Sequence, residues 1–321
     1  MSEPGKAAIA VAGLCKRFGA LVALERLDFS VAPGEIFGLV GPDGAGKTTA
    51  MRLCAGVMRP DQGSIVIDGV DVLAHPERAK RHVSYMPQRF ALYEDLTVAE
   101  NIRFFADLFE MPDELWRARA ETMLAASDMS RFKGRLAGQL SGGMKQKLGL
   151  TCSLVHAPRV LLLDEPTTGV DPISRREFWQ ILYGLRAEGV AMLISTAYLD
   201  EAERCDRLAL LHRGRMMYCD TPAGLKAKMP GAMIEVLSPE PRRVRESLQA
   251  LPGVRSVLLV GNGVHIHADD VGSLAQLQEA LAASGVAFTE LKAVAPTIED
   301  LFVALLDQDA DQVTDLRPEA A

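Results

Sequence analysis

The apolar and polar positions before residue 229 form two kinds of strand pattern. Four continuous apolar runs are typical of parallel strands covered on both faces; they lie in residues 36–40, 83–86, 159–165 and 190–195. Three short runs among turn-rich stretches predict an antiparallel sheet near the N-terminus; they are residues 9–11, 27–31 and 63–67. The two patterns together predict an α/β fold with a mainly parallel sheet and an antiparallel β subdomain.

Apolar residues three or four positions apart predict two consecutive helices at residues 96–109 and 115–126. Helices are also expected at residues 145–156 and 174–185. Because consecutive helices interrupt the alternation of strands and helices, residues of about 89–155 are expected to form a helical subdomain. The first domain is expected to cover residues 1–228.

A different order of elements follows residue 229. The patterns predict strand, helix, strand, strand, helix and strand, which suits a small α+β split-βαβ domain over residues 229–306. A closing helix over residues 297–306 is expected, capped by Thr297 with Asp300 three positions later. His265 and His267 share one face of a strand and, without a third ligand nearby, are expected to face solvent. Residues 307–321 form an acidic tail, which is expected to be disordered.

The stretch GPDGAGKTT carries the strongest chemical signal, because it lies between a predicted strand and a predicted helix. Glycines let successive backbone N–H groups point inward as an anion nest, and the helix that follows adds its positive end. Lys47 can reach terminal phosphates, and the Thr48 hydroxyl can bind Mg²⁺. The stretch therefore predicts a nucleoside triphosphate site built from Gly41, Pro42, Asp43, Gly44, Ala45, Gly46, Lys47, Thr48 and Thr49.

Two carboxylates end the third buried run. Asp164 stands at the carboxyl end of this strand, where ligands bind in doubly wound sheets, and is expected to hold Mg²⁺ through water. Glu165 is expected to polarise an attacking water. A solvated strand end is the alternative, but the phosphate-binding stretch in the same chain favours the functional interpretation.

Two further features point to a nucleotide. Ser141, Gly142 and Gly143 precede the helix predicted at residues 145–156, so they are expected to combine an N-cap with a second anion site. Phe18 precedes the phosphate-binding stretch and is interpreted as a platform for a purine ring, although a core phenylalanine is the alternative. Gln88, by contrast, follows a predicted strand and taken alone would be an ordinary surface amide.

Composition narrows the class of protein. The net charge of −7 argues against nucleic acid as the main partner, since phosphate contacts need a basic face. The five cysteines are odd in number and scattered, which is typical of thiols in a reducing compartment. The N-terminal residues lack the pattern of a secretory signal, and no apolar run is long enough to span a membrane. A cytoplasmic protein is expected.

With these motifs assembled, residues of about 7–225 resemble the ATP-binding cassette (ABC) ATPase subunits of transporters. The stretch at residues 41–49 resembles the Walker A loop, residues 161–165 the Walker B motif, and LSGGM the family's signature. The resemblance implies that Gln88 is the catalytic and metal-contacting glutamine of the Q-loop, that Asp171 belongs to the D-loop, and that Phe18 stacks on adenine. Its implied cofactors are ATP and Mg²⁺, with Lys47, Gln88 and Glu165 in catalysis and Thr48, Gln88 and Asp164 at the metal.

The resemblance also implies partners. Two ATPase domains would pair head to tail, as a homodimer or heterodimer, with Ser141 and Gly143 acting on the nucleotide of the other subunit. The helical subdomain and Gln88 would signal to a separate transmembrane permease, which would hold the chain at the inner face of the cell membrane. The C-terminal domain is similar to that of drug and antibiotic exporters, which implies an exporter. A soluble ABC protein acting on ribosomes or DNA is disfavoured, because the chain has neither two fused cassettes nor a coiled-coil insertion.

One position departs from the family pattern. Ala197 stands where the family has a histidine that contacts the γ-phosphate. Alanine cannot donate a hydrogen bond, and losing one preorganised donor costs about 10²–10³ in rate. The alternative function is therefore a nucleotide-binding, regulatory half of an asymmetric pair with slow hydrolysis, unless Thr196 or Tyr198 compensates.

Overall fold

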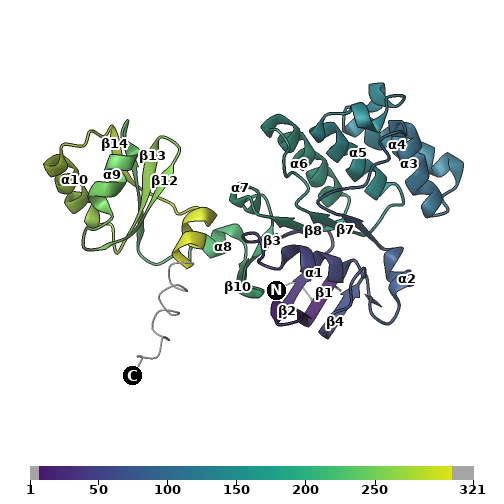
Figure 1. Ribbon diagram of the computed structural model, residues 1–321, viewed down its shortest axis with the longest axis horizontal. Helices are drawn as coiled ribbons and strands as arrows, with labels where there is room; N and C mark the ends of the chain where they lie inside the picture. Colours follow the sequence, from purple (N-terminus) through teal and green to yellow (C-terminus); the bar gives the residue numbers. More distant parts are fainter. Residues whose placement is uncertain (1–6, 306–321) are drawn as a thin grey trace. The chain divides into compact units, whose positions relative to one another are not determined.

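The structure is a computed structural model that describes residues 7–305 (Figure 1). The chain divides into two compact units between Cys219 and Asp220. The sequence placed the boundary nine residues later, and the short helix α8 (Pro222–Lys226) belongs to the second unit. The assignment of residues 229–306 as a functional domain stays a prediction. Among the described residues, no helix combines the length and the apolar composition that crossing a membrane requires.

A six-stranded sheet in the order β10–β9–β3–β8–β7–β6 forms the centre of the first unit. Its strands are β3 (Ile36–Val40), β6 (Val83–Met86), β7 (Val160–Asp164), β8 (Ala191–Thr196), β9 (Arg207–His212) and β10 (Arg215–Asp220). The five strands from β9 to β6 pair in parallel, and every residue of β3 and β7 is buried. The carboxyl ends of β3, β7 and β8 consequently meet at one edge of the sheet, as the apolar runs predicted.

An antiparallel sheet in the order β2–β1–β4–β5 packs on one face of this central sheet. It consists of β1 (Ile9–Phe18), β2 (Leu21–Val31), β4 (Gln62–Ile67) and β5 (Val70–Asp71). The sequence pattern predicted this sheet, but the predicted strands at residues 9–11 and 27–31 are shorter than β1 and β2. Both strands continue through charged residues toward the Phe18–Leu21 pair, with register shifts that interrupt the simple alternation.

Helices cover both faces of the central sheet. On the face with the antiparallel sheet lie α1 (Lys47–Cys54) and α2 (Pro76–Lys80), and on the opposite face lie α5 (Gly142–Leu154), α6 (Pro172–Ala187) and α7 (Leu199–Ala202) (Figure 1). Alternate residues of β7 explain the two layers: Leu162 faces the core shared with α1, whereas Leu161 and Leu163 pack against α5 and α6.

The predicted helical subdomain lies beyond α6 at one end of the first unit (Figure 1). It contains α3 (Val98–Leu108), α4 (Asp113–Ala126), α5 and the 3₁₀ helices Ser130–Phe132 and Ala137–Gln139. Helix α5 begins at Gly142, three residues earlier than predicted, because the Ser141 hydroxyl accepts a hydrogen bond from Met144 N and caps it. These helices share a core of their own around Ile102, Trp116 and Leu148.

The second unit has the predicted order of strands and helices. Its sheet, in the order β12–β13–β11–β14, has antiparallel neighbours throughout. The elements are β11 (Ala232–Leu237), α9 (Pro241–Leu248), β12 (Val254–Val260), β13 (Gly263–Ala268), α10 (Ser273–Ser284) and β14 (Glu290–Val294). A last helix begins at residue 298 and continues to residue 305, so the Leu306 end of the predicted helix and the acidic tail lie outside the described residues.

The prediction that the two histidines of β13 face solvent is wrong. His265 and His267 are 8% and 3% exposed. His265 Nδ1 lies 3.1 Å from both carboxylate oxygens of Asp300 on the last helix, and His267 Nε2 lies 2.6 Å from Pro230 O. The predicted cap of that helix is present, because Asp300 N donates to Thr297 Oγ1 and Thr297 N donates to the Asp300 carboxylate. The last helix therefore covers a sheet face that the strand pattern alone left open.

Candidate functional site

The turn between β3 and α1 has two positions that only glycine fits. A Cβ on Gly41 would stand 2.3 Å from Leu211 O, inside the contact distance of any carbon and oxygen. Gly46 has a φ of 105°, and its Cβ would stand 2.6 Å from Ala23 O. The tight turn brings the N-terminus of α1 to the carboxyl edge of the central sheet. This is the strand, loop and helix arrangement that the sequence motif requires.

A cavity of about 400 Å³ opens above this turn. Its walls come from the end of the antiparallel sheet, the turn itself and the carboxyl edge; the lining residues are Phe18, Leu21, Val22, Ala23, Asp43, Gly44, Ala45, Gly46, Lys47, Thr48, Thr49, Gln88 and Glu165. Phe18 is 47% exposed, so it is not the core phenylalanine of the alternative interpretation. Its ring lies on the wall of the same cavity as the predicted phosphate-binding residues.

Lys47 points its ammonium group to the floor of the cavity. Its Nζ lies 2.7 Å from Gly41 O, 3.1 Å from Pro42 O and 3.2 Å from Glu165 Oε1. The side chain is 4% exposed, and Glu165 is its one carboxylate partner among the described residues. A buried cation held by carbonyl oxygens and one carboxylate is positioned to attract an anion in the cavity.

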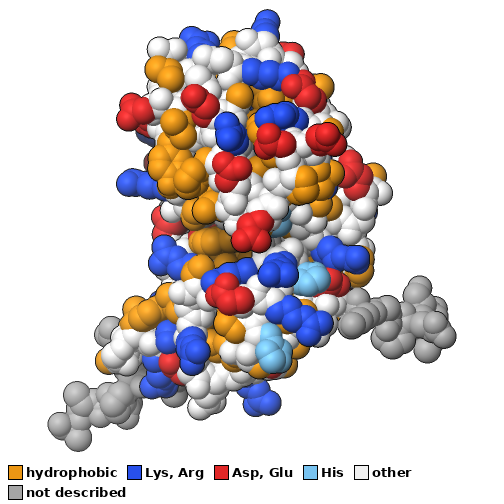
Figure 2. All heavy atoms as spheres, turned by 90° about the vertical axis from the view of Figure 1, so that its right-hand side faces the viewer, with side chains coloured by type: hydrophobic (Ala, Val, Ile, Leu, Met, Phe, Trp, Pro, Cys, Tyr) orange, Lys and Arg blue, Asp and Glu red, His pale blue; other side chains and the backbone are white. Residues whose placement is uncertain are grey.

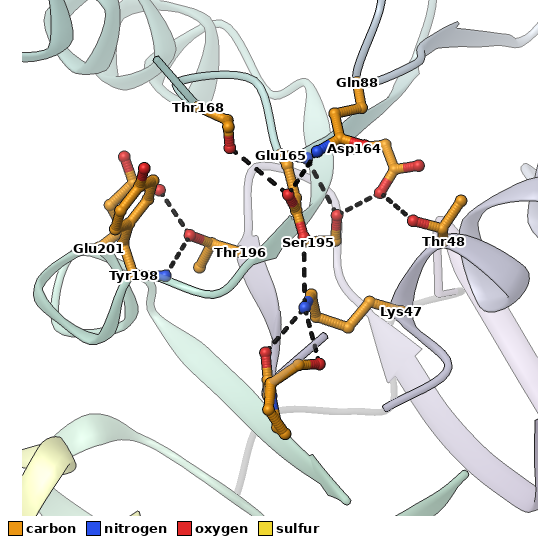
Figure 3. A network of polar contacts seen from close by, with 12 residues as sticks. Lys47, Thr48, Gln88, Asp164, Glu165, Thr168, Ser195, Thr196, Tyr198 and Glu201 are labelled. Atoms are coloured by element: carbon orange, nitrogen blue, oxygen red, sulfur yellow. Dashed lines mark hydrogen bonds and ion pairs between the residues drawn. The ribbon is translucent and has the colours of Figure 1, made fainter. Parts of the chain in front are cut away.

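Asp164 is surrounded by hydroxyl groups. Its Oδ1 accepts from Ser195 Oγ at 2.5 Å and from Thr48 Oγ1 at 3.1 Å (Figure 3). Its Oδ2 accepts from Tyr85 Oη at 3.2 Å. Burial raises the pKa of Tyr85 to about 12, with a further contribution from the charge of Asp164. Tyr85 is therefore a protonated donor throughout the neutral pH range.

Glu165 leaves the strand in a left-handed conformation, with a φ of 49°. The turn directs its carboxylate toward the cavity, where Oε2 accepts from Gln88 Nε2 at 2.9 Å and from Thr168 Oγ1 at 3.4 Å. The structure thus brings together Lys47, Gln88 and Glu165, which the resemblance assigned to catalysis (Figure 3). A non-glycine residue in this region costs free energy that the surrounding contacts must offset.

The side chains near Asp164 fit a magnesium ion. Mg²⁺ prefers oxygen ligands and is commonly held by one or two carboxylates together with phosphate oxygens. Asp164 and Thr48 supply a carboxylate and a hydroxyl 3.1 Å apart, and Thr48 lines the cavity. Gln88 adds an amide group, whose Nε2 donates a hydrogen bond to Glu165 Oε2. This oxygen-rich set matches the predicted metal ligands, while their ligand roles stay a proposal.

The structure does not bring the predicted signature residues to this cavity. Ser141, Gly142 and Gly143 begin α5, and a Cβ on Gly143 would stand 3.6 Å from a carboxylate oxygen of Asp171. Asp171 caps α6 by accepting from Ile173 N and Ser174 N, and hydrogen bonds to Ser174 hold its pKa below the ordinary value. The signature and Asp171 are therefore neighbours at two helix N-termini outside the cavity of the same chain.

The buried carboxylate of Glu201 anchors the segment around Ala197 through hydrogen bonds. Glu201 Oε2 accepts from Thr196 Oγ1 at 2.8 Å, and its Oε1 accepts from Trp179 Nε1 at 3.2 Å. The Thr196 oxygen also accepts from Tyr198 N at 3.0 Å. Thr196 is 1% exposed, so its hydroxyl is committed to this network and is not free to supply the donor that the resemblance leads us to expect at position 197.

Three residues of the site were missed by the sequence interpretation: Tyr85, Thr168 and Ser195. The available signals were Ser195, which follows four apolar residues of β8, and a tyrosine three residues before Gln88. Ser195 can be assigned to the site only once the strands are aligned, because it pairs with Asp164 across β7 and β8.

The comparisons with known proteins agree with this geometry. The family model described as "ABC transporter" matches residues 24–168. The chain is 42% identical over 304 residues to the "Probable multidrug ABC transporter ATP-binding protein YbhF" of Escherichia coli, a match that covers 94% of this chain and 52% of that protein. The chain therefore spans about half the length of this relative.

A second relative matches over nearly its whole length. The chain is 36% identical to the "Daunorubicin resistance ATP-binding protein DrrA2" of Streptomyces coeruleorubidus, covering 90% of this chain and 92% of that one. Among solved structures, the "Structure of ATP binding subunit of ABC transporter" is 31% identical, with a TM-score of 0.64. That match covers 69% of this chain and 92% of that one.

Proposed function

We propose that this chain, which belongs to the family of ABC transporter ATP-binding proteins, hydrolyses ATP in the cavity above the β3–α1 turn to drive an exporter. Family membership implies ATP binding and hydrolysis. The observation that carries the proposal is the position of Glu165, whose carboxylate lies 3.2 Å from Lys47 Nζ and 2.9 Å from Gln88 Nε2. A general base beside the phosphate-binding lysine is the arrangement that hydrolysis needs.

Each residue has a role in this proposal. The backbone N–H groups of residues 43–49 and Lys47 bind the phosphates, and Phe18 stacks on adenine. Thr48, Asp164 and Gln88 would hold Mg²⁺, which neutralises charge on the phosphates when bound. Glu165 accepts a proton from water as the water oxygen bonds to the γ-phosphorus and the bond to ADP breaks. Gln88 orients the Glu165 carboxylate.

The active assembly is proposed to be a head-to-tail dimer of ATPase domains. Ser141 and the glycines after it are outside the cavity of their own chain and begin α5, a helix start of the kind that can hold an anion. A second copy could present this helix start to the γ-phosphate. The same arrangement would place Asp171, which lies beside Gly143, at the contact between copies.

A membrane-spanning permease is proposed as the second partner, with this chain at the inner face of the cell membrane. Between α4, α5 and α6 lies a groove of about 440 Å³, lined in part by Met123, Leu150 and Ile181. Figure 2 shows hydrophobic side chains between charged ones on the face that includes the helical subdomain. The names of the two relatives support drug export as the process, and a nucleic-acid partner is not proposed.

A second candidate function rests on Ala197. The Ala197 side chain has no hydrogen-bond donor, and the neighbouring Thr196 hydroxyl donates to Glu201. The site on this chain's own Walker A loop would then bind ATP and hydrolyse it slowly, while Ser141 and Gly143 complete a faster site on a different ATPase subunit. In a homodimer, ATP would be hydrolysed on the Walker A loop of this chain. In the asymmetric pair, it would be hydrolysed mainly on the loop of the other subunit.

A mixture of two inactive variants tests the proposed dimer. Lys47→Ala removes the phosphate contact and Ser141→Arg blocks the signature, so each variant alone should lose ATP turnover. In a head-to-tail dimer of the two, one site combines the intact loop of one chain with the intact signature of the other. Turnover should therefore return on mixing, toward half the activity per mixed dimer.

The matched control mixes Lys47→Ala with Glu165→Gln. In that pair, one site lacks the lysine and the other lacks the base, so no site is complete and mixing should restore nothing. Recovery in the first mixture alone supports the proposal. Active protein with no recovery in either mixture would refute the assignment of the signature to the partner's nucleotide.

A further inference from the structure

Asp164 is held by two hydroxyls that the proposed metal site does not use. Ser195 Oγ donates to Oδ1 at 2.5 Å, and Tyr85 Oη donates to Oδ2 at 3.2 Å. The third donor, Thr48, is itself a proposed metal ligand. Ser195 is fully buried and Asp164 is 1% exposed, so these bonds form away from bulk water. One donor on each oxygen fixes the plane of the carboxylate.

Ser195 also contacts the residue after Asp164. Its oxygen accepts a hydrogen bond from Glu165 N at 3.0 Å, and its backbone carbonyl lies at the same distance from that nitrogen. This contact stands at the point where the backbone turns into the left-handed conformation of Glu165, with a φ of 49°. One hydroxyl thus donates to the Asp164 carboxylate and accepts from the Glu165 backbone.

We propose that Ser195 is a positioning residue that orients the Asp164 carboxylate toward the metal and the Glu165 carboxylate toward the nucleotide. The inference rests on the proposed ATPase function. Groups that hold metal ligands from outside typically change metal affinity or activity about 10- to 100-fold when removed. Ser195 acts through Asp164 and Glu165 and touches no substrate, so its removal should weaken the metal-dependent part of nucleotide binding first.

Tyr85 holds the same carboxylate from β6. Its hydroxyl is the only part of the side chain that bonds to Asp164, so Tyr85→Phe removes the contact and keeps the ring. Because the bond is longer than that of Ser195 and involves one carboxylate alone, the expected effect is in the same direction and smaller. Tyr85 thus provides a second, independent test of whether the orientation of Asp164 matters.

The experiment measures ADP binding to the full chain by calorimetry, once with Mg²⁺ and once with EDTA. The ratio of the two affinities isolates the contribution of the metal, and no turnover is needed. Ser195→Thr and Ser195→Val both add one methyl-sized group, but only threonine keeps the hydroxyl. Ser195→Ala removes the hydroxyl without adding volume, so it remains informative if the larger residues do not fit.

A matched control removes a buried serine hydroxyl that makes no hydrogen bond to the site. Ser153 is 4% exposed, and its oxygen has no hydrogen-bond partner in the described part of the chain. Ser153→Ala therefore tests whether losing any buried serine hydroxyl alters binding. It should leave both affinities unchanged.

Ser195→Ala and Ser195→Val should lower the ratio of ADP affinity with Mg²⁺ to ADP affinity in EDTA about tenfold or more, while the affinity in EDTA stays near that of the parent. Threonine should restore the ratio relative to valine. A full metal-dependent ratio in Ser195→Ala would overturn the inference and leave the ATPase proposal standing. If the parent chain itself bound ADP without any metal dependence, the proposed site would fail instead.

Discussion

The Lys47 ammonium and the Glu165 carboxylate form an ion pair of 3.2 Å at the floor of the cavity. The lysine comes from the start of α1 and the glutamate from the end of β7, so the pair joins the phosphate-binding turn to the proposed catalytic base. The two groups have opposite tasks toward a nucleotide, since one attracts phosphate and the other acts on water. Substitution of Lys47 should therefore change nucleotide binding, whereas substitution of Glu165 should change ATP turnover.

Lys47→Met should weaken nucleotide binding, because methionine keeps the length of the side chain but removes its charge and its donors. Charge-assisted hydrogen bonds contribute about 1.5–3 kcal/mol, which corresponds to a loss of about 10- to 150-fold in affinity. Titration with ATP in EDTA measures this loss without interference from hydrolysis. Equal affinity in Lys47→Met and the parent would show that the lysine does not hold phosphate.

Phe18→Ala should reduce affinity for ADP by about fivefold, the equivalent of about 1 kcal/mol of offset stacking. Phe18→Trp should keep or improve the affinity. Pyrophosphate provides the control ligand, because it binds the same loop and has no ring to stack. A loss of similar size for pyrophosphate would mean that Phe18 shapes the cavity instead of binding the purine.

Ala197→His should raise steady-state turnover by up to about 10²-fold if the missing donor limits hydrolysis. Position 197 is exposed, so the larger side chain can be added without filling a core. Ala197→Phe supplies a ring without a donor and serves as the control. An unchanged rate in Ala197→His would remove the support for the slow, asymmetric site.

The His265–Asp300 pair should give the second unit a dependence of stability on pH. The hydrogen bond to Asp300 raises the pKa of His265 above its ordinary 6.5, against the opposing effect of burial. Its stabilising contribution is therefore complete below pH 6.5 and is lost as pH rises through the raised pKa of the folded state. Burial raises the pKa of Asp300, but hydrogen bonds from His265 and Thr297 outweigh it and leave the value below 3.8.

The aspartate contribution has the opposite sign. It is present above pH 3.8 and is lost as pH falls through the lowered pKa of the folded state. Thermal unfolding of the parent and of His265→Gln between pH 5 and pH 9 measures the histidine contribution, which should make the parent relatively more stable at the acid end. A constant difference between the two proteins would contradict the raised pKa.

The sequence predicted the parts of the site that are local in the chain. Residues 41–46 form one turn that leads directly into α1, and Asp164 and Glu165 stand at the end of a buried strand, so neighbouring residues in the sequence were sufficient. Ser195 was missed because its partner, Asp164, is 31 residues away and meets it only through the alignment of β7 and β8. His265 was misplaced for a similar reason: the helix that covers it begins more than 30 residues later.

Steady-state ATP hydrolysis by the parent chain and by Glu165→Gln, with Mg²⁺ and over a range of protein concentrations, is the direct test of Glu165 as the catalytic base. The amide keeps the size of the side chain and its contact with Gln88 but cannot accept a proton from water. Turnover by the parent chain should rise with protein concentration as dimers form, and turnover by Glu165→Gln should be at least 10²-fold lower with ATP binding retained. Equal turnover in the two proteins would contradict the assignment of Glu165 as the base.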